Sequence, residues 1–361
     1  MFDKKTVKDV EIKDQVVLVR ADYNVPIETD DQGKMHIVSD FRIQENLPTL
    51  RYLLEHGAKK IVVISHMGRP EGRDERLSLQ VVAARLAKLL PGVPVEFVDQ
   101  CSGEEVERAV DSAPDGSIIV LENLRFEPGE KQNDETLAEE IIRSTGATLF
   151  VQDGFAVTHR AHASTSAIAK LLPAVAGLLV EKEVTMLRQA IENPEHPFVA
   201  IIGGSKVADK QPLIDKFLPV ADRIIIGGKI AADGYTSEDA QVYVAEDFDE
   251  DAAGNKLDVG PISTCKIADM VSGAKTVIWN GTLGKVEDPA YATASVILAK
   301  ILGESDKITS IICGGDTSGF VENILVNNPD LHYSLISTGG GAALSLLSGE
   351  SMPGLEALED K

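Results

Sequence analysis

The sequence predicts an α/β protein made of two doubly wound parallel sheets, one in each half of the chain, joined by a helix. Short apolar, β-branched runs alternate with segments of helical period, which is typical of parallel sheets covered by helices on both faces. The alternation starts again after a long helical stretch in the middle of the chain. At 361 residues, the chain is also too long for one ordinary core and suits two domains. Both domains are therefore predicted to be Rossmann-like.

The apolar runs are the predicted strands. They are continuously apolar rather than alternating, as expected of parallel strands that are buried on both faces. The first half contains runs at 16–19, 61–64, 95–98, 118–121 and 148–151. The second half contains runs at 199–202, 223–226, 241–244, 276–279, 308–312 and 333–337.

The segments between the strands carry apolar residues at helical spacing, as in "SLQVVAARLAKLL" and "NDETLAEEIIRS". In the second of these, Asn133 or Asp134 is the expected N-cap. The stretch "LLVEKEVTMLRQAIENPEHP" is predicted to be one long helix that ends before Pro194. The expected organisation is a first domain at 1–175, an interdomain helix at 176–195, a second domain at 196–345 and a tail at 346–361.

Composition and charge exclude several classes of function. The net charge of −22 disfavours nucleic acid and anionic membranes as partners. Residues 1–13 are charged and lack the apolar core of a signal peptide, and the longest apolar run, 171–180, is far short of the ~20 residues that span a membrane. Three scattered cysteines without metal-ligand spacing fit a reducing cytosol, so a cytoplasmic location is expected.

Polar side chains, most of them cationic, follow the predicted strands of the first half. The carboxyl ends of parallel strands share one sheet edge, so these side chains are expected to gather there. Clustered cations repel one another unless an anion neutralises them, and the arginine fork matches phosphate and carboxylate. An anion site is therefore favoured over separate surface ion pairs. The residues are Arg20, Asp22, Asn24, Arg42, His66, Arg69, Arg125, His159, Arg160 and His162.

The strand ends of the second half are rich in glycine: "IIGGSK", "IIGGKI", "WNGTLG", "ICGGDTSG" and "ISTGGGAAL". Backbone N–H groups at such turns, and at the helix N-termini that follow them, bind phosphate. These turns indicate a nucleotide site, although any single one could serve only as a tight turn. Asp316 in "GGDT" is either a carboxylate for Mg²⁺ or an N-cap of the following helix.

Lys206 and Lys210 follow the first of these glycine turns. Because proline is tolerated in the first turn of a helix, Pro212 predicts a helix that begins near residue 209, with Lys210 in its first turn. Two cations beside the positive end of a helix dipole are unfavourable without an anion. The two lysines are therefore predicted to clamp a phosphate rather than to be solvated surface residues.

The motifs "RADYNVP", "SDFRI", "SHMGRP", "VLENLRF", "THRAHAST", "GGSKVADK", "WNGTLGKVED", "GGDT", "STGGGA" and "MPGLEALEDK" occur in this order. Over nearly its whole length, the chain resembles the phosphoglycerate kinase family. The resemblance implies reversible phosphoryl transfer between 1,3-bisphosphoglycerate plus ADP and 3-phosphoglycerate plus ATP, in glycolysis and gluconeogenesis. It further implies hinge closure, Mg²⁺ as MgATP or MgADP, and a monomer that acts on small molecules.

The same resemblance implies residue roles. The phosphoglycerate would be bound by Asp22, Tyr23, Asn24, Arg42, His66, Met67, Gly68, Arg69, Arg125, His159 and Arg160. The nucleotide would be bound by Gly203, Gly204, Lys206, Lys210, Gly260, Asn280, Glu287, Gly314, Gly315, Asp316, Thr317, Gly339 and Gly340. Glu287 would contact the ribose, Asp316 the metal, and Arg42, Lys206 and Lys210 would be catalytic. The C-terminal tail would return to the first domain.

The chain departs from the family after Gly228. The stretch "GGKIAADGYTSEDAQVYV" passes almost directly from one strand to the next, roughly two helices short of the family's length, with Lys229 in place of a third glycine. The chain is either a naturally compact variant or lacks residues here. Since this segment helps to wall the adenine pocket in the family, weak discrimination between ATP and GTP is expected. Smaller departures are "DGFAVTHR", Thr282 in place of proline, and Asp288 after Glu287.

The sequence leaves two alternative functions. An NAD-linked oxidoreductase would need G-x-G-x-x-G after a strand with an acidic residue ~20 positions on, and the sequence has no such constellation. A non-catalytic phosphometabolite-binding protein with a degraded nucleotide site is the second alternative, because the shortened segment lies on the nucleotide side.

Overall fold

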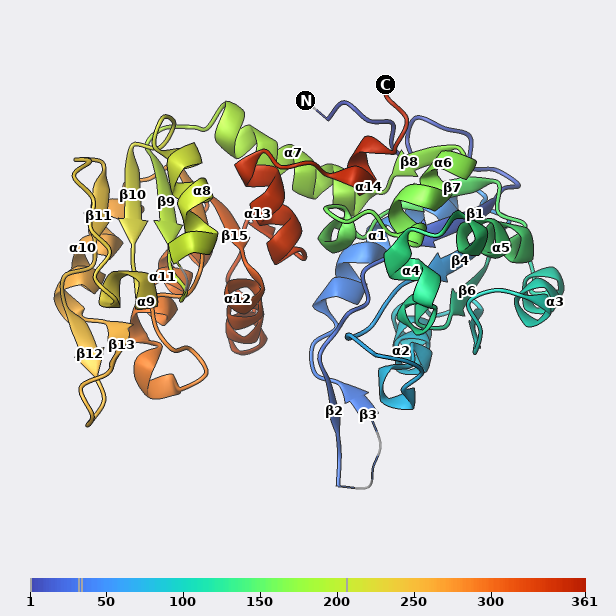
Figure 1. Ribbon diagram of the computed structural model, residues 1–361, viewed down its shortest axis with the longest axis horizontal. Coiled ribbons are helices and arrows are strands. Elements are labelled where there is room, and N and C mark those ends of the chain that lie inside the picture. The colour runs from blue at the N-terminus through green and yellow to red at the C-terminus, as the bar shows by residue number, and fades with distance from the viewer. Residues whose placement is uncertain (1, 32, 34, 206) are drawn as a thin grey trace. The chain divides into compact units, whose positions relative to one another are not determined.

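The computed structural model describes residues 2–31, 33, 35–205 and 207–361, which form two compact units. The first unit comprises Phe2–Lys182 together with Ser351–Lys361, and the second comprises Glu183–Glu350. The division falls within helix α7 (Leu178–Glu192), labelled in Figure 1, which is the long helix that the sequence predicts between the two halves. It ends before Pro194, as expected.

In the first unit, the described residues form a parallel sheet of six strands in the order β5-β6-β4-β1-β7-β8. The chain winds from β1 toward β4, β5 and β6 and then turns in the other direction to β7 and β8, so the sheet is doubly wound. The strands are β1 (Val16–Arg20), β4 (Lys60–Ile64), β5 (Val95–Val98), β6 (Ser117–Leu121), β7 (Leu149–Gln152) and β8 (Ala174–Ala176). The sequence predicted all of them except the three-residue β8.

Helices that connect these strands bury their apolar side chains against the sheet. Asp134 is the N-cap of α5, since its side chain accepts a hydrogen bond from the Thr136 N–H, whereas Asn133 ends α4 in the left-handed conformation. The helices are α1 (Phe41–Glu55), α2 (Gln80–Leu89), α3 (Glu104–Ser112), α4 (Pro128–Gln132), α5 (Glu135–Thr145) and α6 (Ile168–Leu171), with short helical turns at η2 (Leu124–Phe126) and η4 (Ala163–Ala167).

Both ends of the chain lie side by side in the first unit (Figure 1). The Lys5 N–H donates to the Glu359 carbonyl at 2.8 Å, and the Glu359 N–H donates to the Ala174 carbonyl beside β8 at 2.9 Å. Lys4 and Asp360 pair both through an antiparallel bridge and through an ion pair of 2.6 Å. The tail, which includes α14 (Pro353–Glu356), is therefore built into the first unit.

In the second unit, the described residues form another six-stranded parallel sheet, in the order β11-β10-β9-β14-β15-β16. The strands are β9 (Phe198–Ile202), β10 (Arg223–Ile226), β11 (Val242–Val244), β14 (Thr276–Asn280), β15 (Thr309–Cys313) and β16 (Leu335–Ile336). The helices are α8 (Val207–Phe217), α9 (Gly228–Ala232), α10 (Pro261–Ser272), α11 (Thr293–Gly303), α12 (Gly315–Asn327) and α13 (Gly340–Ser348). The predicted fold class, two doubly wound sheets, is confirmed.

Two antiparallel hairpins were not predicted. One, β2 (Ile27–Thr29) with β3 (Met35–Ile37), projects from the first unit (Figure 1). The other, β12 (Phe248–Glu250) with β13 (Lys256–Val259), precedes α10. Their charged side chains and partial exposure remove the continuous apolar signal that marked the buried parallel strands.

The connection between β10 and β11 is short. It consists of the five-residue helix α9 followed by a largely exposed segment, residues 233–241. The side chain of Lys229 in α9 forms an ion pair of 2.8 Å with Asp233, one turn further along. The chain thus passes from β10 to the edge strand β11 without a longer helix, as the sequence predicted.

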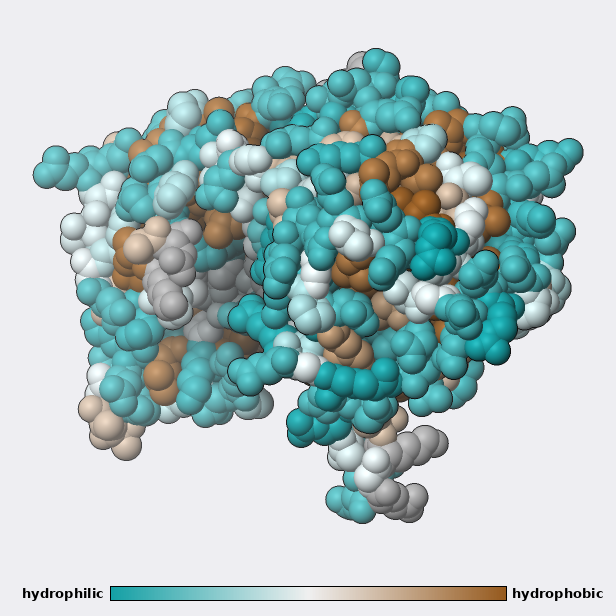
Figure 2. Space-filling model, turned by 45° about the vertical axis from the view of Figure 1, so that its right-hand side comes forward, coloured by the Kyte–Doolittle hydropathy of each residue, from teal (hydrophilic) through white to brown (hydrophobic). Residues whose placement is uncertain are grey.

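Hydrophilic residues cover most of the face seen in Figure 2, with hydrophobic residues scattered among them. This agrees with a chain that carries a net charge of −22. Among the described residues, none of the helices combines the length and the apolar character needed to span a membrane.

Candidate active site

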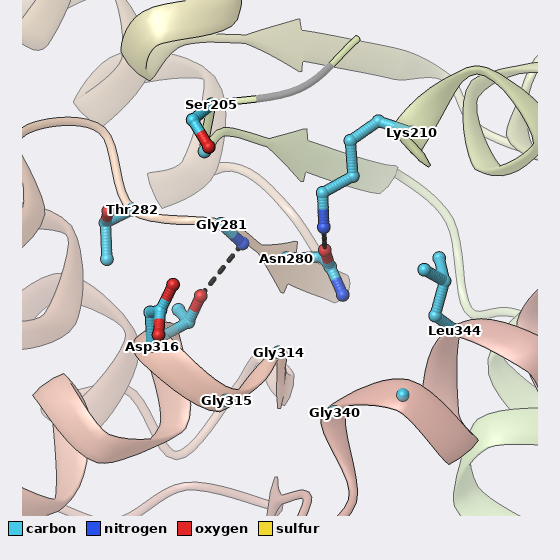
Figure 3. Close-up of a pocket in the computed structure, with 13 residues that line it drawn as sticks. Ser205, Lys210, Asn280, Gly281, Thr282, Gly314, Gly315, Asp316, Gly340 and Leu344 are labelled. Carbon is cyan, nitrogen blue, oxygen red and sulfur yellow. Dashed lines mark hydrogen bonds between the residues drawn. The ribbon is translucent and has the colours of Figure 1, made fainter. Parts of the chain in front are cut away.

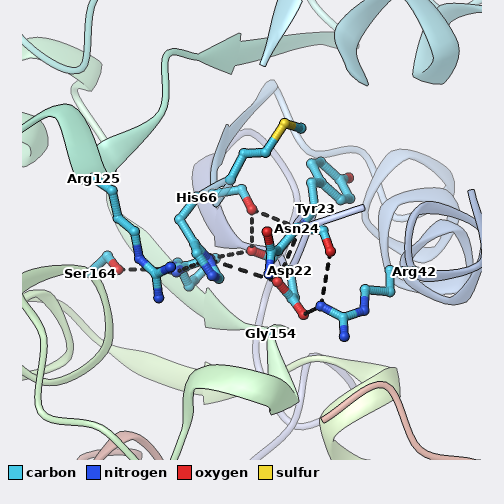
Figure 4. A network of polar contacts seen from close by, with 12 residues as sticks. Asp22, Tyr23, Asn24, Arg42, His66, Arg125, Gly154 and Ser164 are labelled. Carbon is cyan, nitrogen blue, oxygen red and sulfur yellow. Dashed lines mark hydrogen bonds and ion pairs between the residues drawn. The ribbon is translucent and has the colours of Figure 1, made fainter. Parts of the chain in front are cut away.

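The first unit gathers charged side chains at the carboxyl ends of β1 and β4. Arg42, from α1, donates through NH1 to the buried Asp22 carboxylate at 2.7 Å and to the Asn24 carbonyl at 3.1 Å. On the other side of Asp22, the Nδ1 atom of His66 lies 3.8 Å from the second carboxylate oxygen (Figure 4). The side chain of Asn24 accepts the Gly68 N–H at 2.8 Å, which fixes the loop after β4.

Arg125 enters the same cluster from η2. Its NH1 group donates to the Gly68 carbonyl, and Asn123 holds the surrounding loop through hydrogen bonds with the backbone of Met67. Burial, reinforced by the nearby cations Arg160 and Arg20, lowers the pKa of Arg125 to about 10. The guanidinium groups are thus close enough to destabilise one another, which is the electrostatic condition that a bound anion relieves.

The remaining residues predicted for this site differ in their surroundings. Arg160 donates from Nε to the His159 ring at 3.1 Å, and Arg69 is exposed to solvent. Tyr23 and Met67, in contrast, are buried in the hydrophobic core, and the Tyr23 hydroxyl donates to the Asn46 side chain at 2.6 Å. Their side chains therefore support the loops rather than face a ligand.

Three further residues of this cluster lie outside the set predicted to bind the phosphoglycerate: Arg20, Ser164 and Glu130. Arg20, the last residue of β1, is fully buried and donates from Nε to the Ser164 hydroxyl at 2.7 Å. Ser164 in turn donates to the buried Glu130 carboxylate at 2.7 Å. The sequence showed Arg20 at a strand end, but no sequence signal connects it to partners more than a hundred positions away.

The second unit holds a pocket of about 370 Å³ at the carboxyl ends of its strands (Figure 3). Glycine and small polar residues dominate its lining, and Leu344 is the one large apolar side chain among the described residues there. The lining residues are Gly204, Ser205, Lys210, Asn280, Gly281, Thr282, Gly314, Gly315, Asp316, Thr317, Gly340, Gly341 and Leu344.

Two helix N-termini meet in this pocket. α12 begins at Gly315 and α13 begins at Gly340, and no side chain caps the first turn of either helix. A Cβ atom on Gly340 would lie 2.4 Å from the Gly315 nitrogen, so only glycine allows the two ends to approach this closely. Because uncapped N–H groups and the helix dipoles favour negative charge, the geometry is that of a phosphate site.

Lys210 adds a cation to this pocket from the first turn of α8. Its ammonium group donates a hydrogen bond to the Asn280 side-chain oxygen at the end of β14. The helix begins at Val207, earlier than predicted, so Pro212 lies inside α8 rather than in its first turn. Lys206 lies outside the described residues.

Several residues predicted for the nucleotide are not among the residues that line the pocket. The Gly203 N–H donates to the Asn280 carbonyl at 3.0 Å, Gly260 and Gly339 are the N-caps of α10 and α13, and Glu287 is exposed in the loop after β14. Lining residues outside the predicted set are Ser205, Gly281, Thr282, Gly341 and Leu344. The glycine turns pointed to Gly281 and Gly341, whereas nothing in the sequence distinguished Leu344.

The pocket fits a magnesium ion that is held mainly by phosphate oxygens. Asp316 places one exposed carboxylate in the first turn of α12, inside the pocket. Within the described residues, no group of three or more His, Cys, Asp or Glu side chains could enclose a metal. One carboxylate plus phosphates is the usual arrangement for Mg²⁺.

The fold and these two sites define a two-unit α/β protein with an anion-binding arrangement in each unit. The family model for phosphoglycerate kinase matches residues 7–242 and 230–350. The chain is 36% identical over 408 aligned positions to the phosphoglycerate kinase of Dictyoglomus turgidum (strain DSM 6724 / Z-1310), covering 99% of this chain and 100% of that one. It is 39% identical over 404 positions to that of Moorella thermoacetica (strain ATCC 39073 / JCM 9320), with the same coverage. The chain belongs to the phosphoglycerate kinase family.

Solved structures agree. Phosphoglycerate kinase from Coxiella burnetii has a TM-score of 0.76 and 30% identity, covering 98% of both chains. Phosphoglycerate kinase from Pyrococcus horikoshii OT3 has a TM-score of 0.83 and 26% identity, covering 99% of this chain and 98% of the other. The alignments to the two curated relatives are longer than the chain, and the two family-model matches meet at 230–242. That junction coincides with α9 and the segment before β11, where the sequence predicted the shortening.

Proposed function

We propose that this chain catalyses the reversible transfer of a phosphoryl group between 1,3-bisphosphoglycerate plus ADP and 3-phosphoglycerate plus ATP. Full-length relatives named phosphoglycerate kinase support the reaction. The observation that carries the proposal is the pocket in which Lys210 and the N-termini of α12 and α13 converge. Lys210 and the two helix N-termini line this pocket despite the short segment after β10, which supports the kinase over a non-catalytic phosphometabolite-binding protein. An NAD-linked oxidoreductase is excluded by the family.

In this proposal, the cluster of the first unit binds the phosphoglycerate. Arg42 NH1 and the Asp22 carboxylate form an ion pair at 2.7 Å. The pair places a guanidinium donor beside a carboxylate that can accept a hydrogen bond from a substrate hydroxyl. Arg125 and Arg160 supply positive charge for the phosphate, and Arg69 lies exposed on the loop that follows His66. The residues assigned to this substrate are Asp22, Asn24, Arg42, His66, Arg69, Arg125, His159 and Arg160.

The pocket of the second unit binds the polyphosphate of the nucleotide. Lys210 and the N-terminal N–H groups of α12 and α13 hold the phosphates, and Asp316 holds the magnesium ion that accompanies them. When bound, Mg²⁺ neutralises charge on the phosphate oxygens. Lys206 keeps its predicted role as a second phosphate ligand. Gly260 and Glu287 are assigned to the nucleoside side, beyond the lining residues of the pocket.

The chemistry requires no general base. In the direction that consumes ATP, the nucleophile is the carboxylate of 3-phosphoglycerate, which is already ionised at neutral pH. The rate therefore depends on the alignment of carboxylate and phosphate and on positive charge near the transferring oxygens. Arg42 supplies that charge from the phosphoglycerate site, and Lys210 supplies it from the nucleotide site. Because the substrates bind to different units, transfer requires hinge closure, which also excludes water from the acyl phosphate.

We place the enzyme in the cytoplasm as a monomer acting on small molecules, as the composition and the family resemblance suggest. The central experiment is a coupled assay of ATP consumption with 3-phosphoglycerate. A second experiment measures the thermal shift with MgATP and with 3-phosphoglycerate separately, since a ligand that binds the native state raises stability. Stabilisation by both ligands with turnover supports the kinase. Stabilisation by 3-phosphoglycerate alone, without turnover, would show that the nucleotide site does not function.

A further inference from the structure

We infer that Arg20 is a positioning residue that fixes His66 as a neutral hydrogen-bond donor for the anion of the first unit, with the ring proton on Nε2. The inference rests on the proposed function, in which His66 contacts the phosphoglycerate. It assigns a role to Arg20, which neither the motifs nor the pattern of strand ends distinguished from the other cations.

The contact between Arg20 and His66 is buried on both sides. Arg20 is fully buried and His66 is 4% exposed. The NH2 group of Arg20 lies 3.1 Å from the Nδ1 atom of His66. The other nitrogens of the guanidinium are engaged by the Ser164 hydroxyl and the Ala21 carbonyl, so the group cannot swing away from the ring.

This geometry determines where the ring proton lies. Arginine has five N–H donors and no acceptor, so Nδ1 must accept the hydrogen bond. A neutral imidazole with Nδ1 as acceptor carries its proton on Nε2. Asp22 does not compete, because its nearer oxygen is 3.8 Å from Nδ1, beyond hydrogen-bond range. Within the described part of the chain, the contacts of the ring fall on Nδ1, which leaves the Nε2 proton for a ligand.

The surrounding charges also oppose protonation of the ring. The charges of Arg20 from β1, Arg125 from η2, Arg42 from α1 and His162 before η4 all disfavour a positive ring. The carboxylate of Asp22 lies 3.8 Å from Nδ1. Burial is the largest cause, and these cations add to it, so the pKa of His66 lies well below its ordinary value. His66 therefore remains a neutral donor across the physiological range rather than switching its charge.

A buried arginine needs a counter-charge, and Glu130 supplies it through Ser164. Ser164 accepts from Arg20 Nε at 2.7 Å and donates to Glu130 at 2.7 Å. The Ser164 N–H donates to the second carboxylate oxygen at 3.0 Å. The chain Glu130–Ser164–Arg20–His66 thus connects α4, η4, β1 and the loop after β4. Glu130 therefore balances the charge of Arg20 through Ser164, while the Arg20 guanidinium keeps its contact with His66.

The direct test is ¹⁵N NMR of the histidine rings in the free, full-length protein from pH 5.5 to pH 8. The His66→Gln variant assigns the signal of His66 among the seven histidines. We expect a ring that does not titrate in this range, with a protonated Nε2 and an unprotonated Nδ1. A proton on Nδ1, or titration anywhere between pH 5.5 and pH 8, would overturn the inference. This measurement needs no substrate, so it stands apart from any failure of the proposed reaction.

The functional test is a double-mutant cycle. Arg20→Lys keeps the charge but cannot bond to His66, Ser164 and Ala21 together. In the wild-type background it should raise the KM for 3-phosphoglycerate about tenfold, the order of one hydrogen bond to a charged group. The KM for ATP should stay constant. In the His66→Gln background, Arg20→Lys should raise the KM for 3-phosphoglycerate less than about twofold, because the histidine ring through which Arg20 acts is already absent.

An equal cost in both backgrounds would show that Arg20 acts on the site or the fold independently of His66. If Arg20→Lys does not fold, Ser164→Ala takes its place in the cycle, since it removes the acceptor of Arg20 Nε and leaves the guanidinium present. Its effect on the KM for 3-phosphoglycerate should be smaller, about threefold, and should again vanish in the His66→Gln background. Persistence of the effect there would equally reject the role of Arg20.

Discussion

Lys210 and Asn280 meet inside the phosphate pocket, where the lysine ammonium donates a hydrogen bond to the amide oxygen of the asparagine. The amide nitrogen of Asn280 is buried and, among the described residues, has no hydrogen-bond partner. A buried donor without a partner costs free energy that a ligand oxygen recovers. The pair therefore presents two donors to a phosphate that arrives between them.

Lys210→Met should lower kcat by about 10²–10³, the cost of removing one donor that stabilises transition-state charge. ATP affinity should change little, because the N-termini of α12 and α13 still hold the ground-state phosphates. Steady-state kinetics combined with calorimetric binding of MgATP separate the two effects. Lys216→Met, an exposed lysine in the last turn of the same helix, serves as the matched control. Full kcat with poor ATP binding in the Lys210 variant would make Lys210 a ground-state ligand only.

Arg160→Ala and Arg69→Ala should each raise the KM for 3-phosphoglycerate, lower kcat, or both, with a much smaller change in the KM for ATP. The reason is that both arginines belong to the first unit, whereas the phosphate pocket belongs to the second. A charge-assisted hydrogen bond contributes about 1.5–3 kcal/mol, so losses of ten- to a hundredfold are expected. Arg51→Ala, an exposed arginine on α1, is the control. Equal losses of affinity for both substrates would contradict the division of roles.

Much of this architecture could be predicted because buried parallel strands leave a clear signal. Runs such as 61–64 and 118–121 are apolar without interruption, and both became fully buried strands. The β12–β13 hairpin left none, since its short strands mix apolar with charged residues and are only partly buried. The prediction of the start of α8 is wrong by two residues, because it puts Pro212 in the first turn of the helix. That inference failed because a helix can continue past a proline at the cost of one hydrogen bond and some distortion.

The site residues, too, include some that the sequence could predict and one that it could not. Strand ends and glycine turns pointed to Asp22, Arg42, Lys210 and Asp316, because residue type and position alone suggest an anion site. Arg20 could not be distinguished from its neighbours, since its role depends on a hydrogen bond to Ser164, 144 positions away. Contacts of that kind follow from the packing of α4 and η4 against β1, which no local pattern specifies.

Asp153 gives a pH dependence of stability whose sign is defined. It is fully buried, accepts from Asn46 at 2.5 Å and from the Leu179 N–H at 3.0 Å, and burial raises its pKa to about 6. In the unfolded chain its pKa is about 3.9. The folded state therefore binds this proton more tightly, so the free energy of unfolding falls as pH rises from about 4 to about 6, by about 2–3 kcal/mol.

Urea unfolding between pH 4 and pH 7.5 tests this contribution in the Asp153→Asn variant, which imitates the protonated side chain. Because the variant does not titrate at this position, the wild type should lose about 2–3 kcal/mol of unfolding free energy relative to the variant as pH rises from about 4 to about 6, and the difference should then level off. Asp111→Asn, at an exposed position of α3, is the control and should leave the pH profile of the wild type unchanged. A constant difference between the wild type and the Asp153 variant would mean that Asp153 titrates alike in both states.

The short connection between β10 and β11 predicts weak recognition of the base. The described lining of the pocket offers one large apolar side chain, Leu344, and the segment at 233–241 is largely exposed. Lys229 pairs with Asp233. Each Å² of base left in water forfeits ~25 cal/mol, so binding should depend mainly on phosphates and ribose. The kcat/KM values for ATP and GTP should agree within roughly tenfold, or about 1.4 kcal/mol.

The comparison needs ATP, GTP and ITP at the same magnesium and salt concentrations. Lys210→Met provides the control, because it should weaken turnover with all three nucleotides by a similar factor. A preference for ATP of a hundredfold or more would show that the base is firmly held by residues outside the pocket lining.

The pairing of Lys5 with Glu359 has a consequence for biosynthesis. Residues 351–361 complete the first unit, yet a ribosome makes them only after the whole of Glu183–Glu350 has been synthesised. The second unit is continuous in sequence and can fold while the chain is still emerging, since domains generally fold as units. The N-terminal segment of the first unit, by contrast, cannot form its hydrogen bonds to the tail until residues 351–361 have been made. Although it is translated first, the first unit is therefore the last to be finished.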